Sequence, residues 1–208
     1  MSDFNIEDID EEIREAIQTF NDCGFATTFC CSSHFKDRYK VRIEKYKCGD
    51  YKFVNFGIYD PKDPDQETAA ACDFCHGIYG LESISIHNPA YVEFEYMTPG
   101  RMKTFMDAFL ENPNTRHITV RIKASEQSDY CSATLSINFI EVPLDEINAD
   151  RTNVLKHPKR YKKFVKAKLK DAHDLAVREI NCFAEQLAKE VKKKEKEHEE
   201  RMKEDDRN

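Results

Sequence analysis

Residues 159–191 read KRYKKFVKAKLKDAHDLAVREINCFAEQLAKEV, a stretch without glycine or proline in which helix-forming residues dominate. Its apolar residues recur every three or four positions and so share one stripe of a helix. The stripe consists of Val165, Leu169, Ala172, Ala176, Ile180, Phe183, Leu187 and Val191. This pattern predicts a long C-terminal helix that buries the stripe. The preferred partner is the sheet of the same chain, and the alternative is a second copy in a homodimer.

The sequence before this stretch mixes helix and strand patterns. Apolar spacing predicts amphipathic helices over 6–22 and 99–110. Alternation and β-branched or aromatic residues predict strands over 25–30, 39–46, 51–59, 81–86, 91–96, 118–122 and 133–139. Turn residues at Asn88-Pro89 separate two of these strands, and 60–79 predicts the longest loop of the core. The pattern predicts an α+β fold with a mixed or largely antiparallel sheet and two helices, plus the long C-terminal helix.

The charge of the chain is unevenly distributed. The net charge of −7 comes from 32 Lys/Arg and 39 Asp/Glu. Residues 1–155 hold 15 basic and 27 acidic side chains, whereas 156–170 hold eight basic and no acidic ones. We therefore expect an acidic core over 1–150, a basic hinge and amphipathic helix over 151–191, and a charged, solvated tail over 192–208.

The acidic core disfavours nucleic acid as a partner, because it repels phosphate backbones. Nucleic acid is expected only at the basic segment 156–170. The contact residues there would be Lys156, Lys159, Arg160, Lys162, Lys163 and Lys166. The alternative for this segment is a solvated or self-paired basic stretch, which is what most charge runs are.

Hydropathy and cysteine usage bear on the compartment. No apolar run approaches the length of a membrane span, and the acidic start carries no signal-peptide pattern. We therefore expect a cytoplasmic protein outside the membrane, whose eight cysteines are thiols or metal ligands and not disulfides.

The most distinctive segment is GFATTFCCSSH, residues 24–34. A strand here would deliver hydroxyls, thiols, turn amides and an imidazole to one strand end, where they could hold an anion or part of a metal site. The expected ligand-binding residues are Thr27, Thr28, Cys31, Ser32, Ser33 and His34. The alternative is a buried strand whose cysteines are small core residues.

This segment resembles motifs of two protein groups, over residues 8–34. The third enzyme of tRNA wybutosine synthesis, an S-adenosylmethionine-dependent methyltransferase, carries F-F-T-T-S-S-C-S-G-R, which Phe25, Thr27, Thr28, Cys31 and Ser32 match. Uncharacterised phage and bacterial proteins carry G-Y-x-T-x-x-C-C-S-G-H, which Gly24, Thr27, Cys30, Cys31, Ser32 and His34 match. The first resemblance implies cofactor binding near Thr28, Ser32 and Ser33 and RNA contact through 159–170. The second implies no established activity.

The chain departs from both motifs. Ser33 stands where both groups have glycine, so a turn that needs positive φ would be strained there. His34 replaces the arginine of the methyltransferase motif and removes a permanent charge suited to phosphate.

A second motif, Cys72-Asp73-Phe74-Cys75-His76, has the form C-x-x-C-H. A C-x-x-C turn presents two thiolates to one ion, so Cys72 and Cys75 could form half of a zinc site. The second half could be Cys30 or Cys31 with His34, or Cys48. The alternative is that these thiols are simply buried.

No sequence motif of a familiar enzyme class occurs, and no residue is predicted to be catalytic. We expect a non-enzymatic cytoplasmic binding protein of phage or bacterial type that engages a small-molecule ligand or a protein partner through residues 27–34. No cofactor is required by the sequence, and zinc is the one candidate. The alternatives are an S-adenosylmethionine-dependent RNA-modifying enzyme and a zinc-stabilised interaction module.

Overall fold

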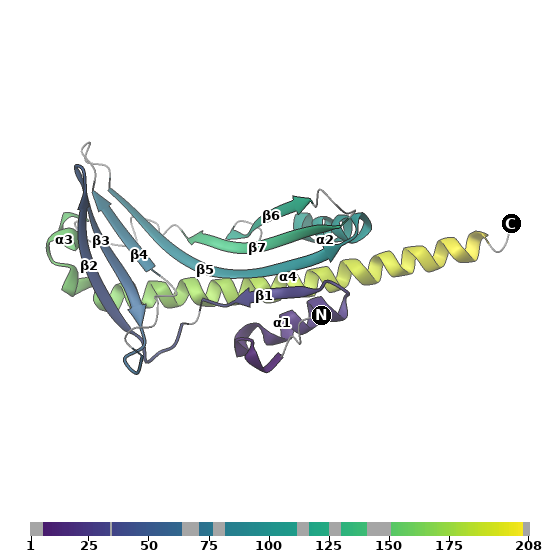
Figure 1. The fold of residues 1–208 in the computed structure, drawn as a ribbon, viewed down its shortest axis with the longest axis horizontal. Helices are drawn as coiled ribbons and strands as arrows, with labels where there is room; N and C mark the ends of the chain where they lie inside the picture. Colours follow the sequence, from purple (N-terminus) through teal and green to yellow (C-terminus); the bar gives the residue numbers. More distant parts are fainter. Residues whose placement is uncertain are drawn as a thin grey trace. The chain divides into compact units, whose positions relative to one another are not determined.

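A computed structural model describes residues 6–33, 35–63, 71–76, 82–111, 117–124, 130–140 and 151–205. The order of elements is η1 (Ile6–Asp8), α1 (Glu11–Asp22), β1 (Thr27–Cys31), β2 (Lys40–Cys48), β3 (Tyr51–Tyr59), β4 (Ala71–His76), β5 (Glu82–Met97), α2 (Pro99–Glu111), β6 (Thr119–Ala124), β7 (Cys131–Ile140), α3 (Arg151–Lys156), η4 (Pro158–Tyr161) and α4 (Lys162–Asp205) (Figure 1). The predicted α+β fold with a long C-terminal helix is confirmed, and every ladder with a described register is antiparallel. None of the helices in these ranges is long and apolar enough to cross a membrane.

The chain forms two compact units, and each is built from separated segments. Unit 1 comprises residues 1–31, 91–136 and 177–208, and unit 2 comprises residues 32–90 and 137–176. Both β5 and α4 run from one unit into the other. The division differs from the expected ranges 1–150, 151–191 and 192–208, because the amphipathic helix supplies core residues to both units and is not an appendage to a core that ends near residue 150.

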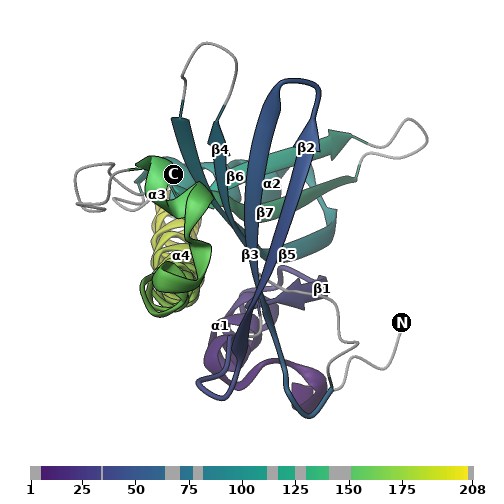
Figure 2. The same cartoon turned by 90° about the vertical axis from the view of Figure 1, so that its left-hand side faces the viewer.

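Unit 2 is built on the antiparallel strands β2, β3, β4 and the first half of β5, in that order (Figure 2). Alternate residues of a strand point to opposite faces, so one face of the sheet is apolar. Val41, Val54, Phe56, Ile58, Cys72, Phe74 and Ile86 of this face form one buried cluster with Val154, Val165, Leu169 and Ala172. Full burial of a side chain the size of valine or phenylalanine contributes about 1.5–3 kcal/mol.

Unit 1 has an aromatic core. Its strands are β1 and the second half of β5, with β7 next to β5 and β6 next to β7. Phe20 of α1, Phe94 of β5, Phe105 of α2 and Phe183 of α4 are all fully buried. Neighbouring rings meet edge to face, with centroids 5.0 Å apart for Phe20–Phe94 and 5.0 Å for Phe105–Phe183.

The apolar stripe of α4 is covered within the chain. Its residues from Val165 to Leu187 are at most 1% exposed, and Val191 is partly exposed. The preferred interpretation, packing on the same chain, is therefore confirmed, and the stripe is not available to a second copy as a homodimer surface. Beyond Val191 the helix continues to Asp205 with mostly exposed, charged side chains.

Two strand predictions were wrong. Residues 71–76, expected within a loop, form β4, because Cys72 and Phe74 alternate into the core of unit 2. The turn expected at Asn88-Pro89 is absent from β5, which is one 16-residue strand. The ladder with β4 ends at His87 and the ladder with β1 begins at Tyr91. Pro89, which has no N–H to donate, lies between these two ladders and so is tolerated.

The helix α1 ends as predicted at Gly24. This residue has φ +79°, and the N–H of Gly24 donates to the Asn21 carbonyl at 2.9 Å while that of Phe25 donates to the Phe20 carbonyl at 2.9 Å. The positive φ is what calls for glycine here; a Cβ would lie 2.7 Å from the guanidinium of Arg101, which is the flexible end of a side chain that can move aside.

One carboxyl group in unit 1 is buried although one of its oxygens accepts no hydrogen bond from the described residues. Glu179 of α4 is 2% exposed, and its Oε2 has no hydrogen-bond partner in the described structure. Burial raises the pKa of this carboxyl to about 7, while the nearby Arg178 opposes the rise. The folded state therefore holds a proton that the unfolded state releases near pH 4.5.

The Glu179→Gln variant tests this burial. Because the raised pKa contributes stability below pH 4.5 that is lost as the pH rises through about 7, the variant should be more stable than the wild type at pH 8, by about 2–3 kcal/mol. At pH 5 the two proteins should differ much less. Urea unfolding at both pH values measures the difference, and Glu185→Gln, at an exposed site on the same helix, is the control. An equal effect of Glu179→Gln at pH 5 and pH 8 would contradict the assignment.

Candidate functional site

β1, the strand within the 24–34 motif, begins with Thr27, which is hydrogen-bonded to another residue of unit 1. Thr27 is buried, its N–H donates to Asn21 Oδ1 at 3.2 Å, and its Oγ1 accepts from Asn21 Nδ2 at 2.8 Å. These bonds hold β1 to the end of α1. Thr28 is half-buried and its Oγ1 has no hydrogen-bond partner within the described ranges, while Cys31 is half-buried at the end of β1.

The turn after β1 is held by a histidine from α4, within unit 2. Nδ1 of His173 lies 2.8 Å from the Ser32 carbonyl oxygen and 3.1 Å from Ser33 Oγ. Since a carbonyl only accepts, Nδ1 carries the proton and donates it to Ser32. Ser33 adopts φ +74°, so the positive φ expected at this position is present without glycine. Ser32, Ser33 and His173 are at most 5% exposed.

These contacts give the motif a structural role. Thr27, Ser32 and Ser33 are buried and bonded within the protein, and neither of the two pockets described below includes a residue of the motif. His34 lies outside the described residues. Ligand binding at residues 27–34 therefore stays a prediction, and no described cavity favours it.

The C-x-x-C motif does not form the turn that a zinc half-site needs. Cys72 and Cys75 lie three positions apart on β4, so their side chains leave opposite faces of the strand. Cys72 is 1% exposed, and burial raises the pKa of its thiol to about 12, which disfavours the thiolate. Within the described residues, no group of three or more His, Cys, Asp or Glu side chains could hold a metal ion.

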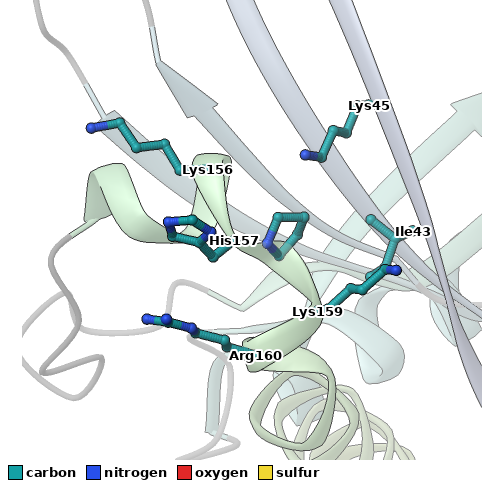
Figure 3. A pocket seen from close by; sticks show the side chains of 7 residues that line it. Ile43, Lys45, Lys156, His157, Lys159 and Arg160 are labelled. Atoms are coloured by element: carbon teal, nitrogen blue, oxygen red, sulfur yellow. The ribbon is translucent and has the colours of Figure 1, made fainter.

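Unit 2 contains a pocket of about 530 Å³ with a basic lining (Figure 3). Its residues come from β2 and from the corner between α3 and α4. They are Ile43, Lys45, Lys156, His157, Pro158, Lys159 and Arg160. Four cations and an imidazole thus lie beside the apolar side chains of Ile43 and Pro158, and none of the described lining residues is acidic.

Local sequence builds the corner that carries most of these residues. Pro158 opens the short helix η4, where its missing N–H costs nothing, and the N–H of Arg160 donates to the His157 carbonyl at 3.1 Å. Val154 before the corner and Tyr161 after it pack on the apolar cluster of unit 2. With the apolar positions turned inward, the basic side chains point away from the core.

Lys45 reaches the pocket because of its strand register. It is paired with Val54, a buried residue, and therefore leaves the sheet on the same face as the core. Lys45 lies beyond the apolar cluster along β2, and Figure 3 shows it on the other side of the view from Lys156.

The pocket cations are not neutralised by neighbours. In the part of the chain that the structure describes, none of Lys45, Lys156, Lys159 and Arg160 forms an ion pair. Arg38 of the same unit differs, since it forms an ion pair with Asp60 and holds the pKa of that carboxyl below its usual value. A cluster of unpaired cations around a cavity is a local attraction for anions.

The predicted nucleic-acid residues divide into two groups. Lys156, Lys159 and Arg160 are brought together in the pocket. Lys162, Lys163 and Lys166 lie in the first turns of α4 outside its lining, and the ammonium of Lys166 donates to the Asp37 carbonyl. Charge counting missed Lys45 and Ile43, because only the register of β2 against β3 shows which face they occupy.

A second, smaller pocket of about 240 Å³ lies in unit 1. It is lined by Glu95, Tyr96, Lys123, Ala124, Tyr130, Cys131 and Ser132. Its lining carries both charge signs, so it has no single-sign attraction for a charged ligand.

Comparison with protein-family models, with curated proteins and with solved structures finds no match to this chain.

The His173→Ala variant tests the structural role of the motif. It should lower the free energy of unfolding by about 2–3 kcal/mol, because the buried Ser32 carbonyl loses its donor and a cavity opens beside Phe35. His173→Asn keeps an N–H near the position of Nδ1, so its free energy of unfolding should fall by less. His198→Ala, at an exposed site of α4, is the control for urea unfolding. A His173→Ala variant as stable as the wild type would show that the contact is dispensable.

Thiol labelling tests the placement of the cysteines. Cys48 is exposed at the β2–β3 turn and should react first with iodoacetamide, whereas Cys72 should be among the last because it is buried and its pKa is raised. Peptide mass spectrometry over a time course measures the order. A chelator should leave the protection of Cys72 unchanged, and rapid labelling of Cys72 on chelation would instead indicate a bound metal.

Proposed function

We propose that this chain is a non-enzymatic binding protein whose ligand carries phosphate or a comparable cluster of negative charge and occupies the basic pocket. The observation that carries the proposal is the convergence of Lys45, Lys156, Lys159 and Arg160, all without ion-pair partners among the described residues, on a pocket of about 530 Å³. This volume lies within the range of small-molecule sites.

The pocket chemistry suits a ligand with a charged end and an apolar or ring-shaped end. An ammonium binds phosphate as a point charge, and a guanidinium can donate two parallel hydrogen bonds to it. Ile43, Pro158 and the ring of His157 offer surface to the uncharged part. The described lining residues offer cations, an imidazole and apolar surface, and the proposal assigns binding to this pocket.

The proposal also includes a cellular location and a type of source organism. A cytoplasmic location fits the free thiols of all eight cysteines, since disulfides form in oxidising compartments. The phage or bacterial type rests on the resemblance of residues 24–34 alone.

Calorimetry with ATP as the probe tests the proposal. The wild type should bind ATP at low salt, and the double variant Lys159→Gln/Arg160→Gln should bind it at least about 10-fold more weakly, because each lost charge-assisted hydrogen bond costs about 1.5–3 kcal/mol. The matched control is Lys189→Gln/Lys192→Gln, which removes two exposed cations of α4 in unit 1. Absence of ATP binding by the wild type, or equal weakening by both double variants, would refute the proposal.

A further inference from the structure

The lysines of unit 2 continue beyond the pocket along the β2–β3 hairpin. Lys47 is paired with Lys52, two positions further along the ladder than the pair Lys45–Val54. Because side chains alternate with period two, Lys45, Lys47 and Lys52 leave the hairpin on the same face. All three are exposed, and in the described part of the chain none forms an ion pair. We call these three residues the hairpin track.

The opposite face of the hairpin has a different character. Tyr46 and Phe53 form a cross-strand pair there, with ring centroids 5.1 Å apart, and Glu44 and Asp73 occupy the same face. Glu44 and Asp73 therefore lie across the sheet from the hairpin track, on the same face as Arg42. On the track's own face, the row that contains Lys47 and Lys52 continues through His76 of β4 to Glu82 of β5, so this row keeps a net positive charge.

The dimensions of the hairpin track match those of an extended polyanion. Lys45 and Lys47 are two residues apart on one strand, a distance of about 6.5–7 Å between their backbone positions, and the Lys47–Lys52 pair lies about 5 Å apart across the ladder. Lys45 belongs both to the track and to the pocket lining, so the two basic surfaces are continuous.

We propose that a single strand of nucleic acid binds along the hairpin track and into the basic pocket. Its phosphates contact the hairpin track and the cations Lys156, Lys159 and Arg160, and one unpaired base lies on Ile43 and Pro158 beside the ring of His157. This inference rests on the proposed function and names the class of ligand. A duplex fits less well, because a base can enter a concave pocket only when it is free of its partner strand.

An acidic peptide is the competing occupant, and two observations favour nucleic acid over it. The pocket combines apolar side chains with an imidazole ring, a surface on which a base can stack and which a carboxylate does not use. The hairpin track adds regularly spaced point charges, which suit a backbone that carries one charge per repeat. The acidic remainder of residues 1–155 would then restrict a polyanion to this one face of unit 2.

Fluorescence anisotropy with a labelled 15-nucleotide oligothymidylate, measured over a range of salt concentrations, tests the inference. The double variant Lys47→Gln/Lys52→Gln should bind the oligonucleotide more weakly, and the slope of log K against log salt should shrink by about 1.4, because about 0.7 is lost for each phosphate contact of a single strand. Its ATP binding should stay close to that of the wild type, since neither lysine lines the pocket. Lys159→Gln/Arg160→Gln should weaken the binding of both ATP and the oligonucleotide. Lys189→Gln/Lys192→Gln should weaken the binding of neither.

The outcomes separate this inference from the proposed function. Lys47→Gln/Lys52→Gln could keep the wild-type slope of log K against log salt while Lys159→Gln/Arg160→Gln loses ATP binding. That result would refute nucleic-acid binding by the hairpin track and would leave anion binding by the pocket supported. If the wild type binds no ATP, the proposed function fails first. A duplex of the same length or a polyglutamate peptide that competes as well as the oligothymidylate would overturn the assignment to a single strand. Unchanged urea midpoints of the variants, expected because the replaced lysines are exposed, exclude misfolding as the cause.

Discussion

The burial of one stripe of α4 is the interaction on which both halves of this structure depend. In unit 2, Val165, Leu169 and Ala172 complete the apolar cluster of the sheet. In unit 1, Phe183 of the same stripe packs edge to face on Phe105 and makes a tilted ring contact with Phe20. Each unit has a sheet with an apolar face that its own strands leave uncovered, and burial of such surface is the main favourable term in folding. Without α4, both faces would lose part of their cover.

The same helix also determines which residues remain for function. His173 takes up the polar groups of the turn after β1, so Ser32 and Ser33 serve the fold. The corner before α4 carries the opposite kind of residue, since Lys156, Lys159 and Arg160 form no ion pair among the described residues. Ser32 and Ser33 of the distinctive motif thus have a structural role, while the larger of the two described pockets is lined by the basic segment.

How much of this could be predicted depends on how local each signal is. The spacing of Val165, Leu169 and Phe183 predicted α4, and alternation predicted β2 and β3, because both patterns need only near neighbours in the sequence. β4 was missed since its six residues follow Asp and Pro turn signals, and only pairing with β3 shows that Cys72 and Phe74 enter the core. The break expected at Asn88-Pro89 was wrong for a similar reason, as proline is tolerated where two ladders leave a gap.

The candidate site follows the same rule. Charge counting grouped Lys156, Lys159 and Arg160, which also line one pocket, because they are close together in the sequence. It could not find Lys45, which joins them from β2 through a register, nor the contact of Ser33 with His173, which lies 140 residues further along the chain. Contacts of that sequence separation leave no periodic trace in a single sequence.

The interleaving of the two units constrains how this protein can be divided. Unit 1 is assembled from three separate segments and unit 2 from two, and both β5 and α4 pass from one unit into the other. No single cut in the chain yields a contiguous fragment that contains all of one unit and nothing of the other. A nascent chain released before residue 177 would lack Phe183 and the other α4 residues of the unit 1 core, so the first unit to begin synthesis can be completed only when the last helix has been made.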